Sequence, residues 1–170
     1  MKTLISFLIL MSLLMTSVFS QEKSKKEIKE EQKLEKQKQI EALVNSKEFV
    51  FVARYANPSG GRQVDLTTNP NYVKYNPELM DGDMPFFGRA YSGAGYGGDG
   101  GIKFKDKPKT FTVEKGKKNF QIDAEVRGEN DTYRLSLSVS FEGSASLSII
   151  SNNRSTISYQ GEISAPAKPK

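Results

Sequence analysis

Residues 120–127 read FQIDAEVR and residues 133–141 read YRLSLSVSF, so that apolar and polar side chains alternate with a period of two. Successive side chains of a β-strand point to opposite faces of a sheet, and each stretch therefore predicts a strand with one apolar face. The polar segment Gly128-Glu-Asn-Asp131 between them has the composition of a tight turn. Together they predict an antiparallel hairpin with one face in a core and the other in solvent.

The same alternation continues on both sides of this hairpin, with turn-forming segments at 115–118, 142–143 and 151–154. Consecutive hairpins of this kind form an antiparallel meander. The opposite face is rich in Ser, and we expect it to be solvated. We expect the apolar face to consist of Phe111, Val113, Phe120, Ile122, Ala124, Val126, Tyr133, Leu135, Leu137, Val139, Phe141, Ala145, Leu147, Ile149, Ile157, Tyr159 and Ile163.

Further strands are predicted upstream, at 49–56, 62–66 and 71–76. In the first of them Phe49, Phe51, Ala53 and Tyr55 alternate with the other side chains and share one face. The fold class is therefore mainly β, with residues 47–164 as a single β domain. We expect the meander to close into a β-barrel, because closure leaves no exposed sheet edge; a β-sandwich is the alternative.

The two ends of the chain differ from this β region. Residues 1–20 have the order of a signal peptide, with Lys2, an apolar run over 4–15 and small residues before Gln21. The run is about half the ~20 residues of a bilayer span, so we expect no stable membrane insertion once the signal is removed. The predicted location is exported, periplasmic or secreted. Without Cys the chain has no site for a lipid anchor, so we expect no lipoprotein. Residues 165–170 are expected to be a disordered tail.

Residues 21–46 are rich in Lys, Glu and Gln and predict a charged helix. Apolar side chains are sparse until Ile40, Leu43 and Val44, which have the spacing of a helix face. We expect this last part to pack on the β domain and the rest to be solvated, so that the segment serves as a spacer.

The composition excludes several classes of function. The 170 residues include no His, Cys or Trp and carry a net charge of +5. No imidazole or thiolate is available as a nucleophile, base or metal ligand, so a Ser-His-Asp triad or a zinc site is excluded. The positive charge is not gathered in a stripe with aromatic side chains, which argues against nucleic acid as a partner. We expect a protein that is not an enzyme and has no catalytic residue, no metal and no cofactor.

The unusual stretch lies between the two β regions, where half of the 14 glycines fall between Gly88 and Gly101. Aromatic side chains between glycines predict a segment that caps the barrel mouth or contacts a small apolar ligand there. Nearby arginines are candidates for meeting anionic groups, with ion pairs to loop aspartates as the alternative. The candidate ligand-binding residues are Phe86, Phe87, Arg89, Tyr91, Tyr96, Asp99, Arg54 and Arg62.

Two sequence motifs in this stretch lack the neighbouring residues or structure that their usual function requires. Gly93-x-Gly95-x-x-Gly98 spells a dinucleotide fingerprint, but no helix follows to hold a pyrophosphate. Asp81-Gly-Asp83 resembles the start of a calcium loop, but Pro85 stands where a third ligand is needed, and Asp81-Gly82 is a hairpin-turn signal. A hydrolase that uses loop carboxylates remains a third hypothesis, with Asp65, Asp81, Asp83 and Asp99 as candidates.

Several segments in order carry a resemblance to a known family: Asn57-Pro-x-Gly-Gly-Arg62, Phe86-Phe-Gly-Arg-Ala-Tyr91, Tyr96-Gly-Gly-Asp-Gly-Gly-Ile-Lys-Phe104, Asn130-Asp-Thr-Tyr133, and Ser151-Asn-Asn-Arg154 with Ile157-Ser-Tyr159. Over about residues 40–163 the chain resembles an exported bacterial family catalogued as domain of unknown function 4251. The resemblance implies a lipocalin-like barrel and export, often as a lipoprotein, for which this chain lacks the Cys. It implies no activity, ligand or catalytic residue.

Two hypotheses of function follow. The first is an exported β-barrel that binds a small apolar ligand or a partner at the glycine-rich, aromatic segment. The alternative is a structural or interaction protein of the cell envelope that uses the charged helix or the Ser-rich face.

Overall fold

The computed structural model describes residues 25–91, 100–129 and 131–167. The predicted signal peptide and the end of the predicted tail therefore lie outside the described residues. The elements are α2 (Lys25–Ser46), β1 (Phe49–Pro58), β2 (Val64–Asp65), β3 (Tyr72–Tyr75), β4 (Met80–Met84), β5 (Ile102–Asp106), β6 (Thr110–Lys115), β7 (Asn119–Arg127), β8 (Thr132–Ser140), β9 (Ser144–Ser151) and β10 (Ile157–Ser164). The strands and the helix residues from Leu34 onward form one compact unit.

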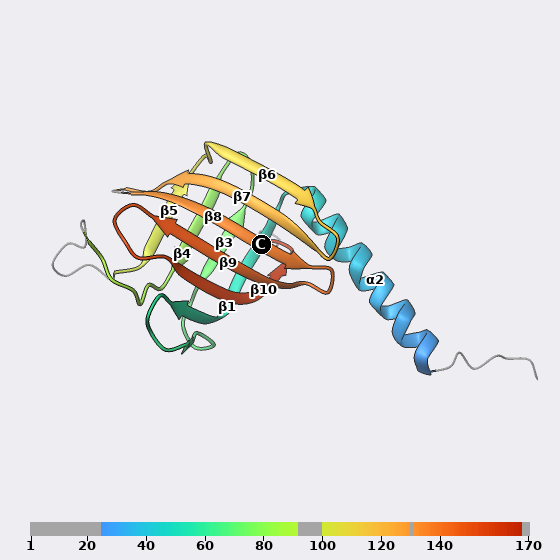
Figure 1. The fold of residues 1–170 in the computed structure, drawn as a ribbon. Coiled ribbons are helices and arrows are strands. Elements are labelled where there is room, and N and C mark those ends of the chain that lie inside the picture. The colour runs from blue at the N-terminus through green and yellow to red at the C-terminus, as the bar shows by residue number, and fades with distance from the viewer. Residues whose placement is uncertain (1–24, 92–99, 130, 168–170) are drawn as a thin grey trace, which may run out of the picture. The chain divides into compact units, whose positions relative to one another are not determined.

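The strands form one curled antiparallel sheet, as Figure 1 shows. Its order is β5-β4-β3-β1-β10-β9-β8-β7-β6, with β2 paired to β1 beside this path. From β6 to β10 each strand pairs with its neighbour in the chain, and the first strand, β1, then pairs with the last, β10. The mainly β, antiparallel and barrel-like prediction is confirmed, and the sheet is consistent with a lipocalin-like fold.

The predicted apolar face fills the inside of the sheet. All its members are buried except for three that are half-buried, Phe111, Val113 and Phe141. Large rings occupy the interior: Tyr75 stacks on Phe49, with ring centroids 4.8 Å apart, and meets Phe111 edge-on. Burial raises the pKa of the Tyr75 hydroxyl, which has no hydrogen-bond partner among the described residues. Bulky side chains, therefore, occupy the interior around β1 and β3.

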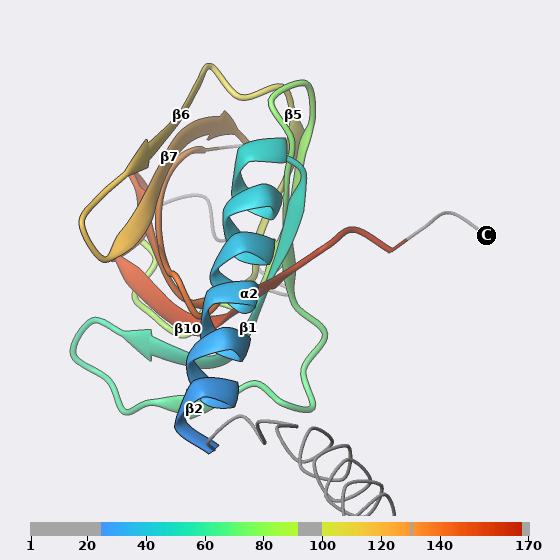
Figure 2. The ribbon, with the colours of Figure 1, turned by 90° about the vertical axis from the view of Figure 1, so that its right-hand side faces the viewer.

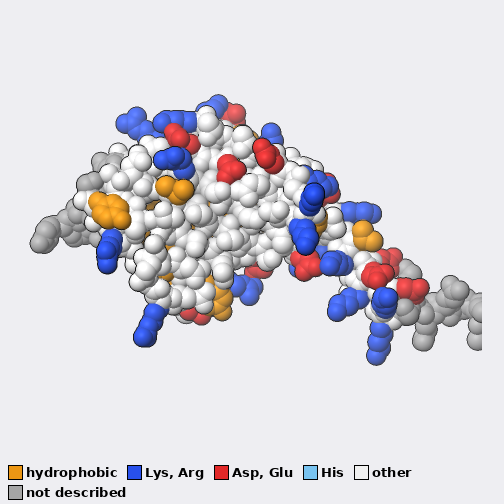
Figure 3. Space-filling model, in the orientation of Figure 1, with side chains coloured by type: hydrophobic (Ala, Val, Ile, Leu, Met, Phe, Trp, Pro, Cys, Tyr) orange, Lys and Arg blue, Asp and Glu red, His pale blue; other side chains and the backbone are white. Residues whose placement is uncertain are grey.

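The outer face of β7 to β10 is lined with small polar side chains. The register places Ser136 beside Ser148 and Ser138 beside Ser146 on neighbouring strands. Figure 3 shows the middle of this face largely free of charged and apolar side chains, with acidic and basic side chains along its upper part. Ser136 donates to Asp123 at 2.6 Å, so part of the face satisfies its own hydrogen bonds.

β1 changes face halfway along its length. Its register with β10 shifts between Ala53 and Tyr55, which marks a β-bulge. Phe49, Phe51 and Ala53 are buried as predicted, but Tyr55 is 39% exposed and Ala56 is fully buried. The prediction that Tyr55 shares the inner face is therefore wrong, because one extra residue in the strand inverts the alternation beyond it.

At the other edge of β1, the side chain of Asn71 makes the hydrogen bonds that a neighbouring strand would otherwise make. β3 pairs with β1 only as far as Phe51, and β2 pairs from Tyr55. Across this gap the buried Asn71 accepts a hydrogen bond from the Ala53 N–H at 2.7 Å and donates one to the Ala53 carbonyl at 3.1 Å. The amide thus satisfies a buried backbone donor and acceptor that would otherwise lack partners.

The last turns of α2 cover one end of the sheet, as Figure 2 shows. Ile40 and Val44 are buried and Leu43 packs against the core, which confirms the predicted apolar face of the helix. Ile40 lies over Gly143 in the β8–β9 turn, where an added Cβ would come within 2.9 Å of its Cδ1. This helical cover leaves the opposite end of the sheet for the other loops.

One turn prediction is wrong. Asp81-Gly82 lies within β4, paired with β3 on one side and β5 on the other. The ring of Phe104 in β5 lies across Gly82, and a Cβ there would come within 2.3 Å of it. Glycine is needed at this position for close ring packing on a strand rather than for a turn.

The closest backbone approach in the sheet generates a prediction. A Cβ at Gly161 of β10 would lie 2.0 Å from the Val52 carbonyl oxygen of β1, beside the bulge. We expect Gly161→Ala to lower the free energy of unfolding by about 1–3 kcal/mol, because backbone must move to admit the methyl group. Ser158→Ala, a half-buried position three residues earlier on β10, should change it by less than ~0.5 kcal/mol. Urea unfolding measures both, and similar values for the two variants would contradict the prediction.

Candidate functional site

Most of the segments that carry the family resemblance meet at the end of the sheet that α2 leaves uncovered. We call this region the motif end and define it by residues 85–91, 100–102, 127–129, 131–132 and 151–157. Strand pairing brings these parts together, because Met84 lies opposite Ile102, Arg127 opposite Thr132, and Ile149 opposite Ile157. The motif end is therefore fixed by the sheet, although most of it lies in loops.

Residues 85–91 are held as a strap along the β9–β10 connection. Arg89 donates its N–H to the Ser155 hydroxyl at 3.0 Å, and its carbonyl accepts the Ser155 N–H at 2.8 Å. Tyr91 donates its N–H to the Asn153 carbonyl at 2.7 Å, and Ala90 forms a β-bridge with Arg154. The strap is thus paired by its backbone like a short extra strand.

Arg154 joins both flanks of the glycine-rich segment. Its guanidinium lies over the ring of Phe86, with Cζ 5.2 Å from the ring centroid. The same group donates to the carbonyls of Gly100 and, at 3.0 Å, Gly101. Five N–H donors on a planar guanidinium allow it to stack and to hydrogen-bond at once.

The start of the strap is tied to the core by Tyr159. Its hydroxyl donates to the Pro85 carbonyl at 2.7 Å, while the side chain is buried. Burial raises the pKa of this phenol, against an opposing effect of the Arg154 charge, so the hydroxyl keeps its proton and remains a donor. Gly88 then passes close to the Phe86 ring and the Ser155 hydroxyl, where a Cβ would come within 2.5 Å of either side chain.

Asp131 connects the β7–β8 turn to the β9–β10 connection. One carboxylate oxygen accepts the N–H of Thr132 at 2.8 Å and that of Asn152 at 3.3 Å, and the other accepts the hydroxyl of Ser151. The Asp131 carbonyl accepts the Gly128 N–H at 2.9 Å and closes the turn. The role of Asp131 is therefore to position the loops, since its carboxylate is engaged by donors from both.

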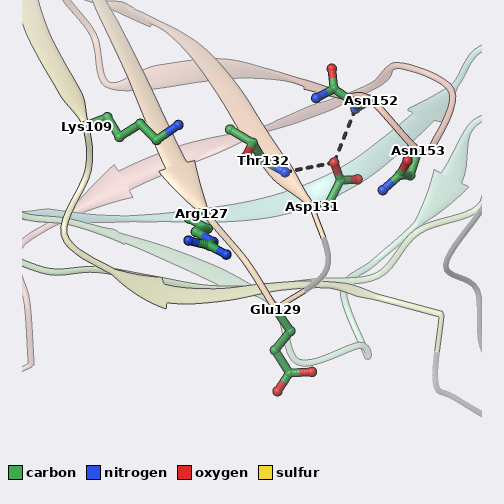
Figure 4. Close-up of a pocket in the computed structure, with 7 residues that line it drawn as sticks. All are labelled: Lys109, Arg127, Glu129, Asp131, Thr132, Asn152 and Asn153. Atoms are coloured by element: carbon green, nitrogen blue, oxygen red, sulfur yellow. Dashed lines mark hydrogen bonds between the residues drawn. The ribbon is translucent and has the colours of Figure 1, made fainter.

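A polar hollow of about 460 Å³ lies beside this network, and Figure 4 shows the residues that line it. Asp131 and Thr132 lie between Arg127 and Lys109 on one side and the two asparagines on the other, and Glu129 points away from the rest. Lys109 is engaged by Glu125, with 3.0 Å between Nζ and Oε1. The lining consists of Lys109, Arg127, Glu129, Asp131, Thr132, Asn152 and Asn153.

The structure brings four of the eight predicted binding residues together on the strap. Phe86 is half-buried under Arg154, whereas Phe87 and Tyr91 are 42% and 69% exposed, and Arg89 is exposed. Tyr96 and Asp99 lie outside the described residues.

The other two arginines among the predicted binding residues, Arg54 and Arg62, do not lie on the strap. Arg54 lies on the outer face of β1 and pairs with Glu162 of β10 at 2.7 Å, and this hydrogen bond raises its pKa. Arg62 is exposed in the segment that follows β1. Arg54 thus follows the alternative of an ion pair, although its partner is a strand Glu rather than a loop Asp.

The described candidate aspartates are engaged separately. Asp81 accepts a hydrogen bond from Tyr72 at 3.1 Å and lies 3.4 Å from Lys74, and Asp83 lies 3.7 Å from Lys103. Hydrogen bonds from the side chain and the backbone N–H of Thr67 lower the pKa of the Asp65 carboxyl. Among the described residues, no group of three or more acidic side chains is placed to hold a metal ion.

The sequence does not single out Asp131, Asn153, Arg154 or Ser155 as site residues. Segment 151–154 predicts a turn, and its side chains have no periodic pattern that indicates contact with residues 85–101. The only signal is that 130–133 and 151–154 both belong to the segments of the family resemblance, which does not say what they contact.

A curled antiparallel sheet with a helix over one end and a braced loop cluster at the other places the molecule among the lipocalin-like β proteins. The family model for the domain of unknown function DUF4251 matches residues 31–163, so the chain belongs to this family. In the part of the chain that is described, no helix is both long and apolar enough to span a membrane.

A solved structure supports the fold. The chain is similar to a DUF4251 family protein from Bacteroides eggerthii DSM 20697, whose crystal structure was determined at 1.95 Å resolution. The TM-score is 0.59 with 18% identity, and the match covers 76% of this chain and 87% of that chain. No curated protein matches the sequence.

The arginine that joins the two flanks yields a second prediction. In Arg154→Met the stacking on Phe86 and the hydrogen bonds to the glycine carbonyls are lost. We expect faster amide hydrogen exchange at Tyr91 and Ser155, with the amides of β7 and β8 unchanged, because local opening requires less free energy. Exchange monitored by NMR tests this, with Arg134→Met on the outer face of β8 as control. Unchanged protection at Tyr91 would show that the strap does not depend on Arg154.

Proposed function

We propose that this protein is an exported, non-enzymatic binding protein that contacts its ligand or partner at the motif end. The observation that carries the proposal is the pair of exposed aromatic side chains, Phe87 and Tyr91, on a strap with a fixed backbone. Aromatic side chains bury a large area for little loss of conformational freedom, and such residues contribute much of the free energy of binding at interfaces.

The fixed backbone strengthens this proposal. A loop that must be ordered on binding loses part of the interaction free energy to that ordering, whereas a braced segment does not. The hydrogen bonds from Arg89, Tyr91 and Ser155 hold the strap before any ligand arrives. Phe86, half-buried beneath Arg154, supports its exposed neighbours.

The interior of the sheet favours binding at the end rather than within. Inside the sheet the ring of Tyr75 contacts those of Phe49 and Phe111, and Tyr159 closes the core below the strap. A large apolar ligand would have to displace these rings. We therefore place the contact on the outer surface of the motif end.

The envelope-interaction hypothesis is the second candidate, with the Ser-rich face as its surface. The specific observation in its favour is that the middle of this face is nearly free of charged side chains (Figure 3) and that the exposed Tyr55 pairs with Gln160 of β10. A partner on this face would contact Tyr55 before it contacts the strap.

Site-specific photocrosslinking distinguishes the two surfaces. We expect a benzophenone amino acid in place of Tyr91 or Phe87 to form a discrete adduct in cells that produce the protein, because these side chains contact the partner. The same group in place of Tyr55, which is 39% exposed, serves as the matched control. Adducts at Tyr55 alone would move the contact to the Ser-rich face, and adducts at none of the three would refute a macromolecular partner.

Export follows from the charge and hydropathy of residues 1–20 and has its own test. We expect the protein isolated from the producing bacterium to begin at Gln21, since Val18 and Ser20 provide the small residues before the cleavage site. Mass spectrometry of the intact protein measures this. Ser20→Arg should block cleavage and leave the uncut precursor. A full-length protein in the cytoplasmic fraction would contradict the proposal.

A further inference from the structure

We propose that the polar hollow at the motif end binds a neutral, polyhydroxylated ligand, namely a short saccharide, with Arg127 as its main hydrogen-bond donor. The inference deepens the proposed function and depends on it, because it names the class of ligand. It starts from the volume of the hollow, about 460 Å³, which lies within the range of ~300–1,000 Å³ that is usual for small-molecule sites.

The charges of the hollow select a neutral ligand. Two cations, Lys109 and Arg127, stand against two anions, Glu129 and Asp131, in the lining. Lys109 is further offset by its ion pair with Glu125. A multiply charged anion would therefore find no net positive charge. A metal ion would find two basic side chains and an aspartate whose carboxylate is already engaged.

The polar groups of the lining match hydroxyl groups. A sugar hydroxyl both donates and accepts, so its site needs both kinds of partner close together. The guanidinium of Arg127 supplies several donors, and none of them has an ion-pair or hydrogen-bond partner among the described residues. The hydroxyl of Thr132 and the side-chain amides of Asn152 and Asn153 add donors and acceptors. None of the described residues that line the hollow is apolar, which argues against a lipid or another hydrophobic ligand there.

Hydrogen bonds hold in place the two loops that line the hollow. Asp131 ties the β7–β8 turn to residues 151–152, and the Asn153 N–H donates to Ser151 at 3.1 Å. The Asn153 carbonyl in turn holds the Tyr91 N–H. The connection that holds the strap therefore also supplies Asn152 and Asn153 to the lining of the hollow.

The test uses the full chain without its signal, residues 21–170, and a panel of saccharides. The panel contains neutral mono- and oligosaccharides, the matching uronic acids, and inorganic phosphate, each titrated by calorimetry and by NMR. We expect at least one neutral saccharide to bind, with Arg127→Met weakening it at least tenfold. Arg134→Met, an exposed arginine on β8 outside the lining, should stay within twofold of the parent.

Each outcome bears on the inference. No binding of any neutral saccharide at millimolar concentration would overturn it, as would binding of the uronic acids or phosphate alone. Binding that Arg127→Met leaves unchanged would move the sugar to another surface and also overturn it. Thr132→Val is a second variant that removes a lining hydroxyl and keeps the shape, so a folding defect in one variant does not decide the result. Adducts at Tyr91 without saccharide binding would retain the proposed function and refute only the saccharide.

Discussion

The pairing of β1 with β10 is the interaction on which the rest of the structure depends. β1 is the only link in the sheet between β2 to β4 on one side and β9 to β10 on the other, within the described residues. Its ladder with β10 joins Val50 to Ser164, so the two ends of the β region must meet before the sheet exists. The approach is so close at Gly161 that no side chain fits, and the extra residue at the bulge lets β1 continue.

The same pairing positions the motif end. β10 begins at Ile157, directly after the connection that holds the strap, so a correct register of β10 also sets the position of Arg154 and Ser155. Arg154 then fixes both flanks of the glycine-rich segment, and Asp131 fixes the neighbouring turn. The candidate site thus continues the sheet beyond the strand ends. Its loops are held together partly by backbone pairing and partly by hydrogen bonds from the side chains of Arg154 and Asp131.

The sequence predicts the regular part of this arrangement because alternation reports which side chains are buried. The inner face from Phe120 to Ile163 and the docking of Ile40 and Val44 are confirmed. Alternation cannot reveal a bulge, which inverts the pattern at Tyr55, or a glycine that accommodates a ring, as Gly82 does for Phe104. The alternation also gives no information on Asn71 and Arg154, because their roles depend on hydrogen bonds to backbone groups far away in the chain.

The position of β1 between two neighbours has a consequence during synthesis. β1 leaves the ribosome about a hundred residues before β10 is made, so the edge of this apolar strand that pairs with β10 has no partner for all that time. Such a segment is prone to join the edges of other chains. The Lys- and Glu-rich helix directly before it, together with the polar segment 59–63 after it, flanks the strand with charge and turn residues. Charged and turn-forming residues that flank an apolar strand oppose aggregation of the nascent chain.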